Sequence, residues 1–142
     1  MPDEEFMKIA IQEAKKGDFP FGAVIVKDQK IIVKVHNTAK KLDPTLHAEI
    51  NAIREACKIL KTIDLSNCTL YSTCEPCPMC FTAAWWANIS KIVYGMEGED
   101  VTEDEWKIDV KCSYLNSKSG NKIQIKGGVL RKECIKLLNL NK

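Results

Sequence analysis

The chain has 142 residues, of which 45% are hydrophobic and 28% charged, and its formal net charge is +2. This length and composition predict one globular domain, residues 1–142, with enough residues to bury a core. The net charge is too small to argue for or against a polyanionic partner, and no apolar run is long enough to span a membrane.

The first part of the chain predicts a helix followed by a hairpin. Its initial segment, MPDEEFMKIA, lacks the basic and apolar regions of a signal peptide, so we expect a cytoplasmic protein. A helix is predicted from Asp3, as its cap, to about Lys16. Residues 21–26 are a continuous apolar run, typical of a strand buried on both faces. Residues 31–35 are its predicted antiparallel neighbour.

The rest of the chain alternates between helices and strands. A helix beginning near Thr45 has a predicted buried side formed by Ile50, Ile53, Cys57 and Leu60. Further strands are predicted at 68–72, 91–95 and 123–125, and further helices at 77–87 and about 130–138; residues 96–122 are expected to be irregular. This alternation predicts the α/β class, with a partly parallel sheet covered by helices on both faces.

Three cysteines at intervals of three residues stand in TCEPCPMC, residues 73–80: Cys74, Cys77 and Cys80. The pattern alone is compatible with a structural zinc knuckle, a redox dithiol, a disulfide or a catalytic metal site. The chain has seven cysteines, an odd number, and the cytosol keeps thiols reduced. Metal binding or catalysis therefore explains the cluster better than a disulfide framework does.

A second candidate motif, His47-Ala48-Glu49, lies thirty residues before Cys77, at the start of a predicted helix. Cys77 and Cys80 also open a helix, where their i, i+3 spacing places both on one face. Helix N-termini favour the ligating thiolate form of cysteine. His47, Cys77 and Cys80 would leave the fourth position of a tetrahedral zinc for water, as in catalytic sites. Glu49 would then be the carboxylate that moves protons between water and substrate.

The order H-x-E, then P-C-x-x-C, resembles the signature of the cytidine-deaminase-like superfamily of zinc-dependent nucleobase and nucleoside deaminases. Within it, the chain is most similar to bacterial guanine deaminases, with tRNA adenosine deaminases next. The resemblance covers most of the chain, through FPFGAVIVKD, DPTLHAEINAIREACK, LYSTCEPCPMC, AAWWA and IKGGVLRKECIKLL. It implies a three-layer α/β/α sandwich with a five-stranded mixed sheet, one zinc ion per chain and a homodimer.

The resemblance also assigns roles to individual residues. It implies zinc ligation by His47, Cys77 and Cys80, and proton transfer by Glu49. Cys74 matches no ligand in these families and is expected to be a small buried residue.

Three further residues are implied to meet the substrate. The backbone N–H of Ala48 would face the metal-bound water or the substrate. Asn37 would anchor the base or sugar, and Phe21 would line the pocket near the ring.

The segment from Glu97 to Asp109 bears on the choice of substrate. Its acidic residues are Glu97, Glu99, Asp100, Glu103, Asp104, Glu105 and Asp109, against Lys107 as its one basic residue. In the family this region closes over the pocket, so a polyanion docking there would be repelled. We therefore expect a small neutral base or nucleoside as substrate. The resemblance to guanine deaminases implies guanine, converted to xanthine plus ammonia, and carboxylates suit its N–H edge, so Asp109 is expected to orient the purine.

Other functions remain open from the sequence. Cytosine or another nucleoside is one alternative. Adenosine-to-inosine deamination in tRNA is another, favoured by the carboxyl-terminal stretch IKGGVLRKECIKLL. A structural zinc or interaction module, in which the metal only stabilises the fold, belongs to a different class and requires four protein ligands.

Overall fold

The structure is a computed structural model that describes residues 2–140, without the side chain of Asp104. The ends of the predicted domain, residues 1 and 141–142, lie outside the described residues. The helices are α1 (Asp3–Ala14), α2 (Ala48–Leu60), α3 (Pro78–Trp86), α4 (Cys112–Lys118) and α5 (Arg131–Lys136), and the strands are β1 (Gly22–Lys27), β2 (Lys30–His36), β3 (Cys68–Cys74), β4 (Lys91–Met96) and β5 (Gln124–Lys126). Short 3₁₀ turns follow at η1 (Gly98–Asp100), η2 (Asp104–Trp106) and η3 (Leu137–Asn139).

Within the described chain the strands form one five-stranded mixed sheet in the order β2-β1-β3-β4-β5. β1 is antiparallel to both β2 and β3, whereas β3, β4 and β5 are parallel to one another. Asp28 and Gln29, at the β1–β2 turn, both have positive φ, the conformation that tight hairpin turns require. The predicted hairpin and the predicted mixed sheet are confirmed.

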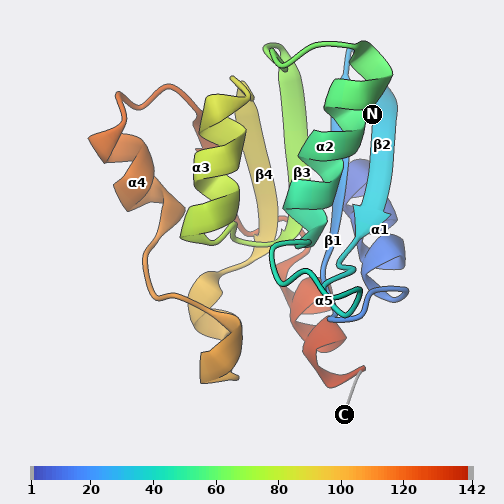
Figure 1. The fold of residues 1–142 in the computed structure, drawn as a ribbon. Helices are drawn as coiled ribbons and strands as arrows, with labels where there is room; N and C mark the ends of the chain where they lie inside the picture. The colour runs from blue at the N-terminus through green and yellow to red at the C-terminus, as the bar shows by residue number, and fades with distance from the viewer. Residues whose placement is uncertain (1, 141–142) are drawn as a thin grey trace.

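Helices cover both faces of this sheet (Figure 1), as the predicted three-layer sandwich requires. β1 shows why both faces are covered, because its side chains alternate between two cores. Ala23 and Ile25 pack into the core under α2 and α3, whereas Val24 and Val26 pack into the core under α1 and α5. A strand buried on both sides has to be apolar at every position, which explains its sequence.

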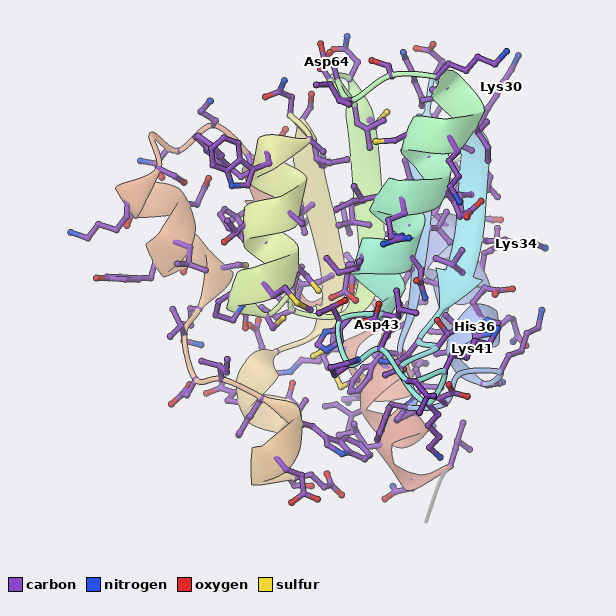
Figure 2. The ribbon with its side chains drawn as sticks, in the orientation of Figure 1. Lys30, Lys34, His36, Lys41, Asp43 and Asp64 are labelled. Carbon is purple, nitrogen blue, oxygen red and sulfur yellow. The ribbon has the colours of Figure 1, made fainter. Side chains whose placement is uncertain are left out.

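β2 is an edge strand and differs from β1 in its exposure. Lys30 and Lys34 are exposed on it, at the margin of the sheet (Figure 2). Lysines on an edge strand oppose pairing with the strands of other molecules.

α1 approaches β1 very closely at Gly22. A Cβ atom there would lie 2.2 Å from the carbonyl oxygen of Ala10 and 2.6 Å from the backbone nitrogen of Ala14. Both are backbone atoms of α1, which cannot move aside independently. Position 22 therefore accepts only glycine in this packing.

Several predicted details differ from the structure. Pro2, not Asp3, precedes the first helix; Asp3 is its first residue and accepts a hydrogen bond from Tyr71 Oη. The predicted buried side of the second helix is only partly buried, and the fully buried positions are Ala48, Ala52 and Ala56. Small alanines allow α2 to lie close to the sheet. Residues 96–122, expected to be irregular, contain α4.

Among the described residues, no helix has the length and apolar character needed to cross a membrane.

Candidate metal centre and active site

Two helix starts meet at one edge of the sheet. β2 and β3 are both antiparallel to β1 and therefore run in the same direction, so their carboxyl ends lie at the same edge. The loop after β2 leads to α2, and the loop after β3 leads to α3. Carboxyl ends of such strands are the usual location of sites in α/β sheets. The topology thus brings together two motifs that are far apart in sequence.

Three side chains that could ligate a metal ion converge at this edge. His47 is the residue immediately before α2, Cys77 is the residue immediately before α3, and Cys80 lies in the first turn of α3. His47 Nδ1 lies 3.7 Å from Cys77 Sγ and 3.5 Å from Cys80 Sγ. All three donor atoms lie within 4.8 Å of one another.

This donor set fits zinc. Tetrahedral zinc, with Zn–S of about 2.3 Å and Zn–N of about 2.0 Å, separates a sulfur from a nitrogen by roughly 3.5 Å. The His47 distances agree with that value. Within the described residues, Cys74 is not a member of the group, which holds three protein donors rather than the four of a structural site.

The electrostatics of the group favour a ligating thiolate. The pKa of Cys77 is lowered to about 4, because the Cys80 thiol hydrogen-bonds to it and His47 lies beside it. The hydrogen bond with Cys77 in turn raises the pKa of His47. The pKa of Cys80 is raised by its hydrogen bond with Cys77 and by burial. The hydrogen bond between the two thiols and the neighbouring His47 thus favour one thiolate in the pair.

Glu49 lies in the first turn of α2, two residues after His47, and is 6% exposed. Burial, together with the negative charge of Cys77, raises the pKa of its carboxyl group to about 7. A carboxyl group with a pKa near the working pH exchanges protons in both directions. The geometry thus provides an acid–base group at the predicted position.

A cavity of about 380 Å³ opens beside these residues, and His47, Glu49 and Cys77 form part of its wall. This volume is within the range of small-molecule sites. Asn37, buried at the end of β2, also lines the cavity. Its side-chain oxygen accepts a hydrogen bond from the backbone N–H of Ala39 at 2.9 Å, which leaves the amide NH₂ as the donor that it can offer a ligand.

Aromatic rings form another part of the cavity wall. Trp106 meets Phe19 edge to face with 5.5 Å between ring centroids, and meets Phe21 at 5.9 Å. All three rings line the cavity. Such walls suit a flat heterocycle, because ring faces and edges both pack well against it.

Only some of the residues predicted to bind substrate line the cavity. Asn37 and Phe21 line the cavity, whereas Ala48 is fully buried and is not part of its wall. Asp109 is exposed and lies outside the wall, where Glu105 is the acidic residue contributed by the same segment. The cavity does not bring Asp109 together with the other predicted residues.

Sequence reasoning missed Phe19, Trp106 and Cys74 as residues of the cavity wall. The repeat of aromatic residues in Phe19-Pro20-Phe21 was a usable signal. Trp106, a large apolar residue within an acidic segment, was another. Cys74 was expected to be a small buried residue; it is half-buried and faces the cavity.

Some acids of the 97–109 segment serve the fold. Glu97 accepts a hydrogen bond from Tyr94 Oη at 2.9 Å. Asp100 forms a bidentate pair with Arg131, with both nitrogen–oxygen distances at 2.8 Å. The charge of Asp100 is therefore matched within the molecule, which reduces the repulsion expected from the sequence.

A buried carboxyl group of raised pKa beside three side chains that could hold a zinc ion, at a cavity walled by aromatic rings, is the arrangement of a zinc-dependent hydrolase of cyclic amidines, the class of nucleobase and nucleoside deaminases. The chain belongs to the family described as the cytidine and deoxycytidylate deaminase zinc-binding region, whose model matches residues 1–96. This membership confirms the resemblance inferred from the two motifs and favours an enzyme over a structural zinc module.

Two relatives of this chain are named for two different activities. The guanine deaminase of Bacillus subtilis (strain 168) is 46% identical over 109 residues, covering 72% of this chain and 70% of that protein. The tRNA-specific adenosine deaminase of Aquifex aeolicus (strain VF5) is 48% identical over 99 residues, covering 66% of each chain. A solved structure from studies of A-to-I editing by tRNA:A34 deaminases has a TM-score of 0.81 at 31% identity, covering 94% of this chain and 99% of the other.

Proposed function

We propose that this enzyme deaminates guanine to xanthine and ammonia. The observation that carries the proposal is the aromatic-walled cavity of about 380 Å³ that adjoins Glu49 and the candidate metal ligands. A free base fits a cavity of this volume. The similarity to the guanine deaminase of Bacillus subtilis supports the same substrate.

In this proposal His47, Cys77 and Cys80 hold one zinc ion. When bound, zinc supplies a Lewis acid that activates water near neutral pH. Glu49 takes one proton from the attacking water and delivers it to the ring nitrogen, then takes the second proton from the hydroxyl added to the ring carbon and delivers it to the leaving amine, which departs as ammonia. Its burial keeps the carboxyl group away from bulk solvent, so the transferred proton stays in the site.

Cavity residues orient the base. Phe19, Phe21 and Trp106 pack against the ring, and Asn37 donates a hydrogen bond to it from its amide NH₂. Glu105, the acid that the 97–109 segment contributes to the cavity wall, can accept hydrogen bonds from the N–H edge of guanine, the role first expected of Asp109. The role of the Ala48 backbone N–H stays a prediction.

Adenosine deamination in tRNA is the second candidate, motivated by the tRNA-specific relative and by the structural match over 94% of the chain. The exposed acids Glu99, Glu105 and Asp109 on the segment beside the cavity argue against it, because RNA-binding surfaces carry an excess of Lys and Arg. Cytosine is a third candidate, since a purine site also has room for a smaller ring.

One experiment separates these candidates. Zinc-loaded protein is assayed for ammonia release from guanine, guanosine, cytosine, cytidine and adenine, and for inosine formation in a tRNA anticodon stem-loop. Guanine turnover well above the other bases is expected. Inosine formation, with binding that weakens steeply as salt increases, would identify the tRNA enzyme instead. Absence of turnover on every substrate would refute all three candidates.

We also propose a homodimer in the cytoplasm. Trp86 is 72% exposed on α3, and its ring lies 5.0 Å from that of Trp85. Exposed tryptophans are enriched at protein interfaces. Light scattering should give twice the chain mass, and Trp86→Glu should reduce it toward the monomer. A monomeric wild-type protein at micromolar concentration contradicts this proposal.

A further inference from the structure

The segment between β4 and α4 forms one side of the cavity. Val101, Trp106 and Val110 are among the residues that it contributes to the wall. Only two short 3₁₀ turns, η1 and η2, give this segment regular structure. Because it lacks the support of a long helix or a sheet, the shape of the cavity depends on other contacts that hold the segment in place.

Glu75 makes two of these contacts. Its Oε1 accepts a hydrogen bond from the backbone N–H of Gly98 at 3.0 Å, and its Oε2 accepts one from the backbone N–H of Cys112 at 2.9 Å. Gly98 lies near the beginning of the segment, and Cys112 is the first residue of α4, immediately after its end. A single carboxyl group, 8% exposed, thus fixes both ends of the segment.

The fit around Glu75 is close. A Cβ atom at Gly98 would lie 3.3 Å from Glu75 Oε1, tighter than an ordinary contact. Glu75 follows β3 directly and stands two residues before Cys77, so the same short loop carries a candidate zinc ligand and the anchor of the segment. The position of the segment is therefore tied to that of the candidate metal centre.

Trp106 connects the anchored segment to the opposite side of the cavity. It lies between the two anchored ends and contacts Phe19 and Phe21, which precede β1 on the other side of the cavity. Fixing both ends reduces the conformational freedom that binding would otherwise have to remove from the segment.

We propose that Glu75 is a positioning residue: by accepting hydrogen bonds from Gly98 and Cys112, it holds the 98–111 segment as a preformed wall with Trp106 against the bound base. Glu75 also forms part of the cavity wall, but both of its carboxylate oxygens are engaged by the segment, so its role is to position Trp106 and not to transfer protons. Its effect is on substrate affinity, because a wall that is ordered for only a fraction of the time lowers the apparent affinity by that fraction. The kinetic part of this inference rests on the proposed function.

The first measurement requires no activity. Glu75→Gln retains one oxygen acceptor and replaces the other with an NH₂ group, which cannot accept. Hydrogen exchange of the segment containing Gly98 and Cys112 should become about 10-fold faster or more, because one backbone amide loses its hydrogen bond to an ionisable partner. Glu99→Gln, the same change at a side chain that is 64% exposed in the same segment, should exchange like the wild type.

The second measurement separates binding from chemistry. Glu75→Gln should retain one zinc per chain and raise KM by about 10-fold, while kcat stays within about twofold of the wild type. Trp106→Ala should raise KM similarly. The double variant should show no more than the larger single effect, since both changes remove the same wall.

The outcomes are distinguishable. Unchanged exchange in Glu75→Gln, or faster exchange with an unchanged KM, overturns the inference. Loss of zinc together with a fall in kcat assigns Glu75 to the metal centre instead and also overturns it. If wild-type protein turns over none of the bases, the proposed function fails, while the exchange comparison still decides whether Glu75 holds the wall. Glu75→Asp, which keeps both acceptors on a shorter side chain, replaces Glu75→Gln should the latter not fold.

Discussion

His47 and Cys77 occupy equivalent positions in two helices: each is the last residue before the first turn, with an extended backbone conformation. At such a position the side chain projects beyond the helix end, toward the site and near free backbone N–H groups. Both side chains therefore reach a common centre although their helices lie side by side on the sheet. The N-terminal ends of both helices also favour the negative charge of a thiolate there.

The ligand set predicts which variants lose the metal. His47→Ala, Cys77→Ala and Cys80→Ala each remove one of three donors and should bring zinc after dialysis well below one ion per chain. Cys74→Ser is the matched control, because Cys74 stands in the same cysteine motif and is not a member of the donor group. Atomic emission spectroscopy measures the zinc content of the three variants and of the control. Loss of zinc from Cys74→Ser would show that the ligand set is incorrect.

Glu49→Gln tests proton transfer without altering the shape of the site. The amide has nearly the same volume but cannot take a proton, so kcat should fall by about 10²–10⁴-fold. In zinc-loaded protein, the zinc content and unfolding temperature of Glu49→Gln should stay close to those of the wild type. Glu55→Gln, the same change at a half-exposed residue of α2, serves as the control. Turnover by Glu49→Gln within tenfold of the wild type contradicts the assignment.

The raised pKa of Glu49 predicts how stability changes with pH in metal-free protein. Its pKa is about 7 when folded, against 4.5 as the ordinary value, so the folded state retains a proton that the unfolded state releases between these values. The stabilising contribution is complete below pH 4.5 and is lost as pH rises through about 7.

Urea unfolding with a chelator, compared between wild type and Glu49→Gln, isolates this contribution. The free energy of unfolding of the wild type, relative to Glu49→Gln, should fall by up to about 3 kcal/mol from pH 5 to pH 8. If the difference in unfolding free energy between wild type and Glu49→Gln is the same at pH 5 and pH 8, the folded-state pKa of Glu49 is not raised.

Asn37 and Asp109 offer a comparison of two residues expected to bind substrate. Asn37→Asp keeps the oxygen that accepts from Ala39 N–H but removes the NH₂ donor, so KM should rise by roughly 10-fold. Asp109→Asn, outside the cavity wall, should leave KM within about twofold. Steady-state kinetics with the accepted base measures both. An unchanged KM in Asn37→Asp would rule out the Asn37 amide NH₂ as a hydrogen-bond donor to the substrate.

The features that could be predicted from sequence depend on short spacings. The i, i+3 pair of Cys77 and Cys80 at the start of one helix, and the apolar run of β1, are local patterns that the fold preserves. The contact of His47 with the two cysteines could be predicted only from the family resemblance, because this contact arises from the parallel directions of β2 and β3.

Residues 96–122 could not be predicted for a physical reason. Their conformation depends on distant partners, such as Glu75 for Gly98 and Arg131 for Asp100, which leave no periodic pattern in the sequence. α4 is short, and only Cys112 and Asn116 in it are buried, so it presents no clear apolar stripe. The prediction that Asp109 contacts the substrate was based on the acidic composition of the segment. Composition does not show which acidic side chain faces the cavity, because the direction of each side chain depends on its distant partners.

The contact of α1 with Gly22 limits how substrate preference can change. Gly22 follows Phe21 of the cavity wall, and its N–H donates to Thr73 Oγ1 at 3.2 Å, one residue before Cys74 of the same wall. Helix backbone on one side and β3 on the other leave this stretch of main chain no direction in which to shift. Because the backbone on either side is fixed, exchanging the side chain at position 21 should change the shape of the cavity wall without moving the main chain, so in the proposed function Phe21 is the position at which to alter selectivity for the base.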